Sequence, residues 1–131
     1  MVISNWESQT NMGPSNIQRI HGPAKGRSTV SIFSGLVFAV AYDPDMAAGI
    51  VDQTRNTLAF LDKHLVDAGS DKSAILQATV YLCDMSMKPE MDAVWKEWIG
   101  PPENWPQRAC VGADLGEGSL IEVVVTAVQI T

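Results

Sequence analysis

The segment that most constrains the fold of this chain is its last long apolar stretch, residues 120–130. Alternate side chains of a β-strand point to opposite faces of a sheet. One face of this strand would carry Leu120, Val124, Val128 and Ile130, and the other Ile121, Val123, Val125 and Ala127. Both faces are therefore apolar. A strand of this kind has to be covered on both sides.

The rest of the chain predicts a small sheet with two helices. Residues 28–42 read as a hairpin that turns at Ser34-Gly35. A helix is expected over residues 45–68, and a second begins near Pro89 and stops at Gly100. A strand is expected over 73–83, with Leu76, Ala78, Val80 and Leu82 facing the core. A short strand at 108–113 is followed by a glycine-containing hairpin loop at 114–119.

These predicted strands and helices leave one face of the sheet uncovered. Two helices can cover one face, and little of the chain remains for the other. We therefore expect a second copy to cover it, and a monomer in size-exclusion chromatography with light scattering would contradict this. Residues 1–20 are polar and are expected to form an N-terminal arm, flexible or laid over a neighbour. Residues 21–131 are expected to form a single domain.

Composition excludes several classes of protein. Of 131 residues, 46% are hydrophobic and 18% charged, and the net charge of −6 disfavours a nucleic-acid partner. The longest apolar run, residues 36–42, is far too short for a membrane span, and the N-terminus does not resemble a secretory signal. Cys83 and Cys110 do not suggest a disulfide framework, so we expect a reducing, cytoplasmic location.

The residues best suited to chemistry lie near the C-terminus. Arg108 and Cys110 alternate along a strand and share a face. If Gly116 is the centre of a loop joining the last two strands, Cys110 lies opposite Glu122 and all three residues meet. A slip of one residue would move Glu122 to the other face, and the sequence leaves this register open.

These residue types suit a small acid that reacts with water. A guanidinium makes two parallel hydrogen bonds to a carboxylate, and a glutamate can position or deprotonate water. Trp105, three residues before Arg108, could line such a pocket. The plainer alternative, an ion pair between Arg108 and Glu122 with Cys110 as a buried hydrophobe, is the more frequent arrangement from spacing alone. His21 and His64 are too isolated to predict a metal site.

Residues 28–130 resemble the RidA (YjgF) family of reactive-intermediate deaminases, and within it the short YoaB-like members. The matching segments are residues 53–58, 65–75, 78–85, 106–111 and 121–123. The resemblance implies an α+β fold similar to chorismate mutase, with a mixed sheet, two helices on one face and a homotrimer with pockets between subunits.

The resemblance also implies an activity and a set of site residues. It implies hydrolysis of 2-imino or 2-enamino acids to 2-keto acids and ammonia, with no cofactor. Arg108 would hold the substrate carboxylate, Cys110 would contact the substrate through its backbone, and Glu122 would position the attacking water. The family tyrosine ahead of the first strand is absent, so Ser28 or Arg27 takes its place. Family members end their second strand with Ser-Gly-Gln. In this chain residues 40–42, which include Ala41, replace that segment.

These departures keep other functions open. Asp92 replaces a family asparagine, and Arg27 adds a positive charge that would favour a dicarboxylic enamine, such as an aminomuconate-like ring-cleavage product. A second alternative is a module that binds small carboxylates, such as 2-keto acids, without turnover. RNA cleavage, a label attached to parts of this family, fits the acidic composition least.

Overall fold

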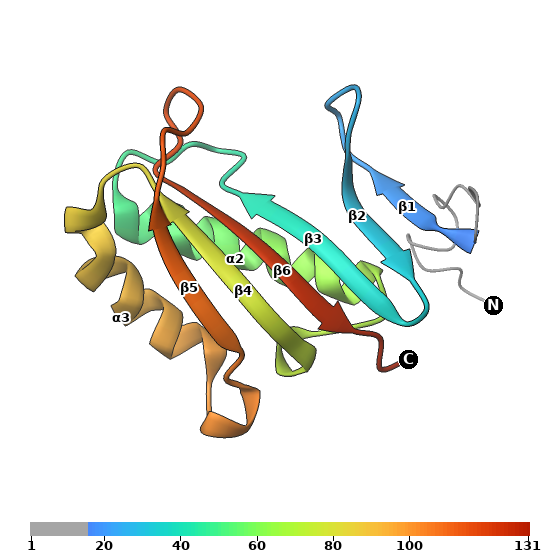
Figure 1. Cartoon of the computed structure of the whole chain (residues 1–131). Coiled ribbons are helices and arrows are strands. Elements are labelled where there is room, and N and C mark those ends of the chain that lie inside the picture. Colours follow the sequence, from blue (N-terminus) through green and yellow to red (C-terminus); the bar gives the residue numbers. More distant parts are fainter. Residues whose placement is uncertain (1–15) are drawn as a thin grey trace.

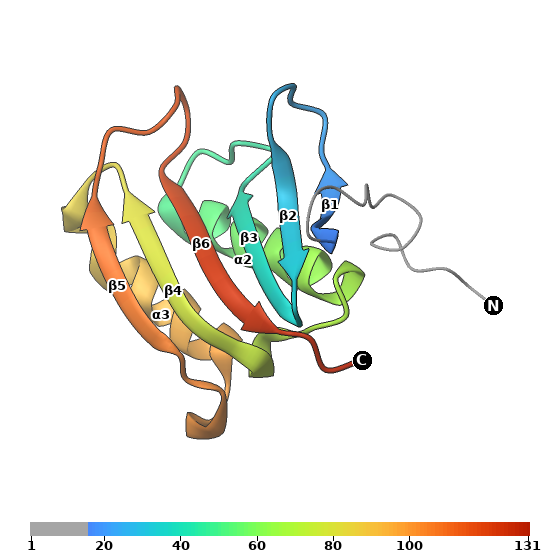
Figure 2. The same cartoon turned by 45° about the vertical axis from the view of Figure 1, so that its right-hand side comes forward.

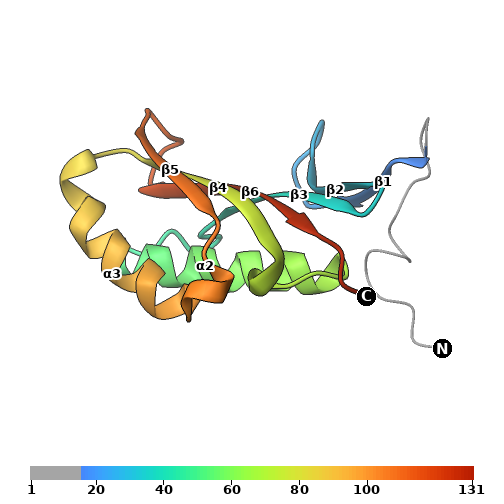
Figure 3. The ribbon, with the colours of Figure 1, turned by 60° about the horizontal axis from the view of Figure 1, so that its bottom comes forward.

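The computed structural model describes residues 16–131 and shows one six-stranded mixed sheet with two helices packed on one face (Figure 1). The strands are β1 (Gln18–His21), β2 (Ser28–Phe33), β3 (Leu36–Tyr42), β4 (Ile75–Leu82), β5 (Gln107–Gly112) and β6 (Ile121–Val128). The helices are α2 (Ile50–Asp67) and α3 (Lys88–Ile99). Figure 3 shows both helices on the same side of the sheet. The α+β prediction is thereby confirmed.

The strand order is β1-β2-β3-β6-β4-β5. Strands β1, β2 and β3 form an antiparallel meander, and β6 lies antiparallel between β3 and β4. Strands β4 and β5 are parallel, and α3 makes the crossover between them. Parallel neighbours need such a crossover because a tight turn cannot reverse the chain direction twice.

The expectation that the last two strands pair with each other is wrong. Strand β4 lies between β5 and β6, and Val80 of β4 is opposite both Cys110 and Val123. The segment at residues 114–119 is therefore a wide connection across β4 instead of a hairpin loop. The physical reason is the crossover: once α3 covers the sheet, β5 returns parallel to β4 at the free edge.

The core lies between the helices and one face of the sheet. Apolar side chains that alternate along the strands fill it together with the apolar stripe of each helix: Val37, Ala39, Val80, Leu82, Val123, Val125, Leu58, Leu61, Leu65, Met91 and Ile99. Leu76 was expected among them but is 52% exposed. The strand register shifts between Ile75 and Gln77, so a bulge turns the Leu76 side chain out of the core.

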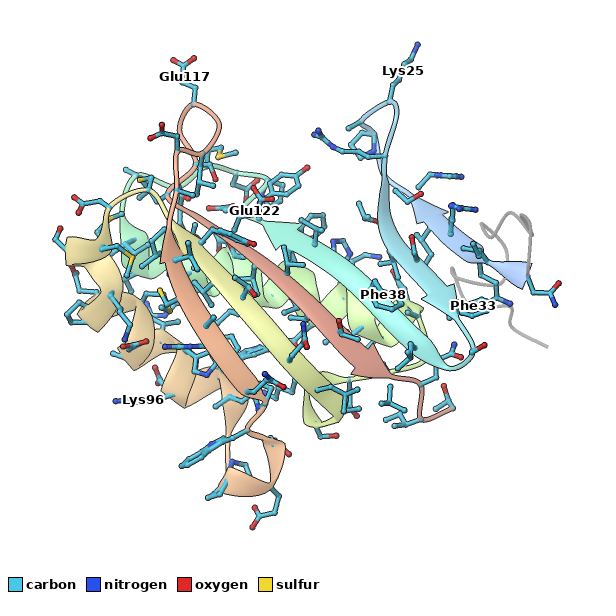
Figure 4. The ribbon with its side chains drawn as sticks, viewed as in Figure 1. Lys25, Phe33, Phe38, Lys96, Glu117 and Glu122 are labelled. Carbon is cyan, nitrogen blue, oxygen red and sulfur yellow. The ribbon has the colours of Figure 1, made fainter. Side chains whose placement is uncertain are left out.

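The opposite face of the sheet carries no helix in residues 16–131 (Figure 4). It exposes large apolar side chains from three strands, namely Phe33, Phe38, Val40, Val124 and Val128. Their exposed fractions range from 36% to 44%. We call this surface the open face. A patch of this kind on a sheet is typical of a protein–protein contact.

Two segments depart from the expected boundaries. Gln18–His21 is a strand paired with β2, so regular structure begins inside the expected polar arm, and residues 1–15 lie outside the described part. Helix α2 begins at Ile50 instead of residue 45. The buried carboxylate of Asp43 accepts the N–H groups of Asp45 and Ala47 and holds the intervening residues in a turn. Neither helix is long and apolar enough to cross a membrane, within residues 16–131.

Candidate functional site

A cleft of about 440 Å³ opens at one end of the sheet, between two raised loops. Figure 2 shows the β1–β2 turn and the β5–β6 loop rising from the same end, and Figure 4 labels Lys25 and Glu117 at their tips. The lining residues are Gly22, Pro23, Ala24, Arg27, Ser28, Thr29, Val40, Tyr42, Gly116 and Glu122. We call this space the Glu122 cleft.

Glu122 provides the carboxylate of this cleft. It lies on β6, opposite Tyr42 of β3 and Tyr81 of β4, and alternates with residues that point into the core. Its side chain is therefore on the open face (Figure 4). Ser28 lines the same cleft, and its hydroxyl lies 3.2 Å from Nδ1 of His21. The cleft thus combines a carboxylate, a hydroxyl and the exposed guanidinium of Arg27.

One buried amide anchors the loop beside the cleft. Gln53 of α2 donates from Nε2 to the carbonyls of Ala47 and Gly118, both at 2.7 Å, and its Oε1 accepts the Leu120 N–H at 2.9 Å. The side chain is 1% exposed. Three hydrogen bonds in this setting fix the start of β6, and with it Glu122, relative to α2.

A second pocket of about 280 Å³ lies between α3 and the edge strand β5. Its lining is two indoles, an isoleucine, a proline and three charged side chains: Trp95, Trp105, Ile99, Pro106, Asp92, Lys96 and Arg108. Trp105 is 63% exposed and donates from Nε1 to the Gly100 carbonyl at 3.0 Å. Trp105 and Arg108 thus line the same pocket. We call this space the Arg108 pocket.

Arg108 is held on three sides. Its Nη2 lies 2.6 Å from Oδ1 of Asp92, its Nη1 lies 3.8 Å from the Met91 sulfur, and its guanidinium carbon lies 5.1 Å from the centre of the Trp95 ring. Cation–π contact and an ion pair both fix the plane of the guanidinium. Only 18% of the Arg108 side chain is exposed. The group is thus oriented before any ligand arrives.

Asp92 also pairs with Lys88, whose Nζ lies 2.8 Å from Oδ2. Burial opposes ionisation of Asp92, but hydrogen bonds from Lys88 and Arg108 outweigh it and hold the pKa of this carboxyl below its usual value. Asp92 is therefore a charged carboxylate throughout the physiological range. The i, i+4 spacing of Lys88 and Asp92 on a helix was the signal in the sequence that could have identified this pair.

The structure separates the residues that the sequence had grouped. Arg108 and Cys110 point to the helix-covered face, whereas Glu122 points to the open face. Cys110 is half-buried against the core, and its burial raises the pKa of the thiol. The side chain of Ala41 is fully buried, and its neighbours Val40 and Tyr42 line the Glu122 cleft instead. Within one chain the two pockets therefore do not meet.

Other candidate groups do not add a site. Within the part of the chain that the structure describes, no three His, Cys, Asp or Glu side chains are placed to hold a metal ion. Cys83 and Cys110 are both free. His64 is buried on α2 against Phe60, with ring centres 4.2 Å apart. Trp98 is half-buried and donates from Nε1 to Asp62 at 3.0 Å.

Comparison with protein families gives a match over most of the chain. The model described as endoribonuclease L-PSP matches residues 26–129. A RutC family protein of Haemophilus ducreyi is 38% identical over 102 residues, which cover 76% of this chain and 86% of the relative. The RutC family protein YoaB of Escherichia coli is 35% identical over 83 residues, covering 63% of this chain and 72% of YoaB.

Solved structures show the same fold. A YjgF-family protein of Neisseria meningitidis superposes with a TM-score of 0.83 at 32% identity, covering 89% of this chain and 98% of that chain. A Salmonella typhimurium protein described as a putative translation initiation inhibitor gives a TM-score of 0.78 at 31% identity, covering 87% and 98%. The likeness therefore extends over most of the chain and is not limited to one motif.

Proposed function

Because this chain belongs to the YjgF family, the family of the endoribonuclease L-PSP model, we propose that it hydrolyses reactive 2-imino or 2-enamino acids to 2-keto acids and ammonia. The observation that carries this proposal is the preorganised guanidinium of Arg108 in a small pocket lined by apolar rings. Such a group suits a small carboxylate with an apolar substituent. Glu122, in the other pocket, supplies the carboxylate that the water step needs.

We further propose that the complete site forms between two copies of the chain. Arg108 and Glu122 face opposite sides of one sheet, so they can act on one substrate only if the Arg108 pocket of one copy adjoins the Glu122 cleft of the next. The apolar open face offers the surface for this contact. A closed ring of three copies, as the family resemblance implies, would repeat this contact three times with the same two surfaces.

The proposed chemistry needs only residues of the chain and water. Arg108 binds the substrate carboxylate and fixes the imine carbon. Glu122 accepts a proton from water as the oxygen attacks that carbon, which forms a C–O bond and moves the C=N electron pair onto nitrogen. Proton transfer to nitrogen then allows the C–N bond to break, and the O–H proton leaves as the carbonyl forms. The products are a 2-keto acid and ammonia.

The test uses 2-iminopropanoate and 2-iminobutanoate made in situ by an amino-acid oxidase in the presence of semicarbazide. A deaminase diverts the imine to keto acid, so the rate of semicarbazone formation falls. Arg108→Ala should abolish the effect, with a loss of about 2–5 kcal/mol in substrate binding because the charge is largely buried. Arg55→Ala, an exposed arginine on α2, is the control for net charge. An unchanged rate with the wild-type protein contradicts the proposal.

Two alternatives have an observation in their favour. Arg27 lines the Glu122 cleft and could pair with a second carboxylate of a dicarboxylic enamine, although its exposure screens the charge. Binding without turnover is favoured by the absence of a tyrosine at residues 25–28. Thermal stabilisation by 2-keto acids together with no imine hydrolysis would support the binding module. The net charge of −6 disfavours an RNA substrate.

A further inference from the structure

The Arg108 pocket contains a carboxylate of its own, placed where a substrate carboxylate is expected to bind. Asp92 bridges the two cations beside it, at 2.6 Å from Arg108 Nη2 and 2.8 Å from Lys88 Nζ. About a fifth of the Asp92 side chain is exposed, 21%, so the bridge borders the pocket. The charges of Lys88, Asp92 and Arg108 sum to one positive charge, not two.

The Arg108 pocket has few groups left that could bind a second anionic group of a ligand. One nitrogen of Arg108 already contacts Asp92, another faces the Met91 sulfur, and one face of the guanidinium lies over Trp95. The remaining wall is apolar, from Ile99, Trp105 and Pro106. Lys96 also lines the pocket, but it is exposed and points away from the sheet on the outer side of α3 (Figure 4). Its charge is therefore screened by solvent.

We propose that Asp92 is a specificity-determining residue that restricts the Arg108 pocket to ligands with a single carboxylate and an apolar or neutral remainder. The inference rests on the function proposed above and narrows its substrate class. One ligand carboxylate matches the single net positive charge of the cluster. A second carboxylate would face Asp92 at short range, and among the residues that line this pocket the cation left to pair with it is the exposed, solvent-screened Lys96, so its desolvation would be poorly compensated.

The experiment measures binding of stable 2-keto acids instead of turnover. Pyruvate and 2-oxobutyrate are the ligands with one carboxylate, and oxaloacetate and 2-oxoglutarate are the ligands with two. Dissociation constants are measured by titration calorimetry at low salt for the wild type and Asp92→Asn. Asparagine keeps the size of the side chain and an oxygen that accepts from Arg108, but removes the charge. Glu97→Gln makes the same change of net charge on the exposed surface of α3 and is the matched control.

We expect the wild type and Glu97→Gln to bind the monocarboxylates at least about tenfold more tightly than the dicarboxylates. Asp92→Asn should bind the dicarboxylates about tenfold more tightly than the wild type does and lose the preference. Its affinity should also fall more steeply with salt, because the cluster then carries two positive charges. Lys88→Gln provides a second variant and should weaken binding of all four acids.

The outcomes separate this inference from the proposed function. An unchanged preference in Asp92→Asn, or a wild type that prefers dicarboxylates, overturns the role of Asp92 while leaving imine hydrolysis possible. The expected preference without imine hydrolysis supports the role of Asp92 and rejects the proposed reaction. If none of the four acids binds the wild type, the role of Asp92 is rejected, and the semicarbazone assay alone then decides the proposed reaction.

Discussion

Arg108 and Glu122 lie on opposite faces of the same sheet, on β5 and β6, with β4 between the two strands. Arg108 pairs with Asp92 under α3, and Glu122 borders the cleft on the open face. A sheet does not let side chains from its two faces meet. Two residues proposed to act on one small substrate must therefore come from different copies of the chain.

This separation predicts complementation between inactive variants. Arg108→Ala and Glu122→Gln should each lose at least about thirtyfold in imine hydrolysis, since one lacks the anchor and the other the base. When the two are unfolded together and refolded as a mixture, some contacts will join an intact Arg108 to an intact Glu122. Random assembly should restore about one quarter of the wild-type activity, because each side of a site is intact in half of the copies.

Two controls make the complementation decisive. Each variant refolded alone should stay inactive, which excludes recovery by refolding itself. A chain that carries both Arg108→Ala and Glu122→Gln has no intact half-site to contribute. Its mixture with the wild type should therefore be no more active than the amount of wild-type protein present. If the mixture of the two single variants remains inactive although light scattering shows mixed assemblies, the site does not lie between copies.

The open face predicts a substitution that dissociates the assembly. Phe38 is 44% exposed at the middle of β3, and Phe38→Asp would bury a charge without a partner in any contact made there. We expect light scattering to show a single copy for this variant and an oligomer for the wild type. Val66→Asp is the control, since Val66 is 64% exposed on the outer side of α2. An oligomer of unchanged mass in Phe38→Asp would place the contact elsewhere.

Much of this architecture could be read from the sequence, because it depends on local patterns. The alternation along residues 120–130, the helix expected to end at residue 68 and the stop at Gly100 all correspond to observed elements. That the second face of the sheet is apolar could also be predicted from alternation alone, whereas its cover by another copy stays a prediction. These features need only the periodicity of a strand or a helix.

The arrangement of the candidate site depended on strand order, which local patterns do not determine. Residues 114–119 look like a hairpin loop, yet a strand, a helix and a strand in sequence also predict the parallel unit formed by β4, α3 and β5. That rule would have placed β4 beside β5 and Arg108 away from Glu122. The bulge at Leu76 and the ion pair between Arg108 and Asp92 depend on tertiary contacts, and no spacing in the sequence predicts their geometry.

The buried amide of Gln53 predicts a large loss of stability on substitution. Gln53→Leu removes three hydrogen bonds and leaves the Leu120 N–H and the carbonyls of Ala47 and Gly118 without this partner. We expect the free energy of unfolding to fall by about 2–4 kcal/mol. Arg55→Leu puts the same side chain on the exposed side of α2 and should change it by less than about 0.5 kcal/mol. Urea unfolding of both variants at one protein concentration provides the comparison.

The buried imidazole of His64 predicts a pH dependence of stability. Burial lowers the pKa of His64 below its ordinary value of 6.5, with a smaller effect from the positive charge of Lys63, and Nε2 has no hydrogen-bond partner. The unfolded chain therefore binds this proton more readily than the folded one. The free energy of unfolding should then decrease as the pH falls below about 6.5 and be fully recovered above that pH.

The measurement is urea unfolding between pH 5.0 and 7.5 at a fixed protein concentration, since assembly itself shifts stability. In this range Asp43 and Asp92 remain ionised, because their hydrogen bonds lower both pKa values below 3.8. His64→Leu fills the same apolar space without a titratable group and should flatten the profile, whereas substitution of the exposed His21 by glutamine should preserve it. A profile in His64→Leu as steep as that of the wild type would assign the proton uptake to another group.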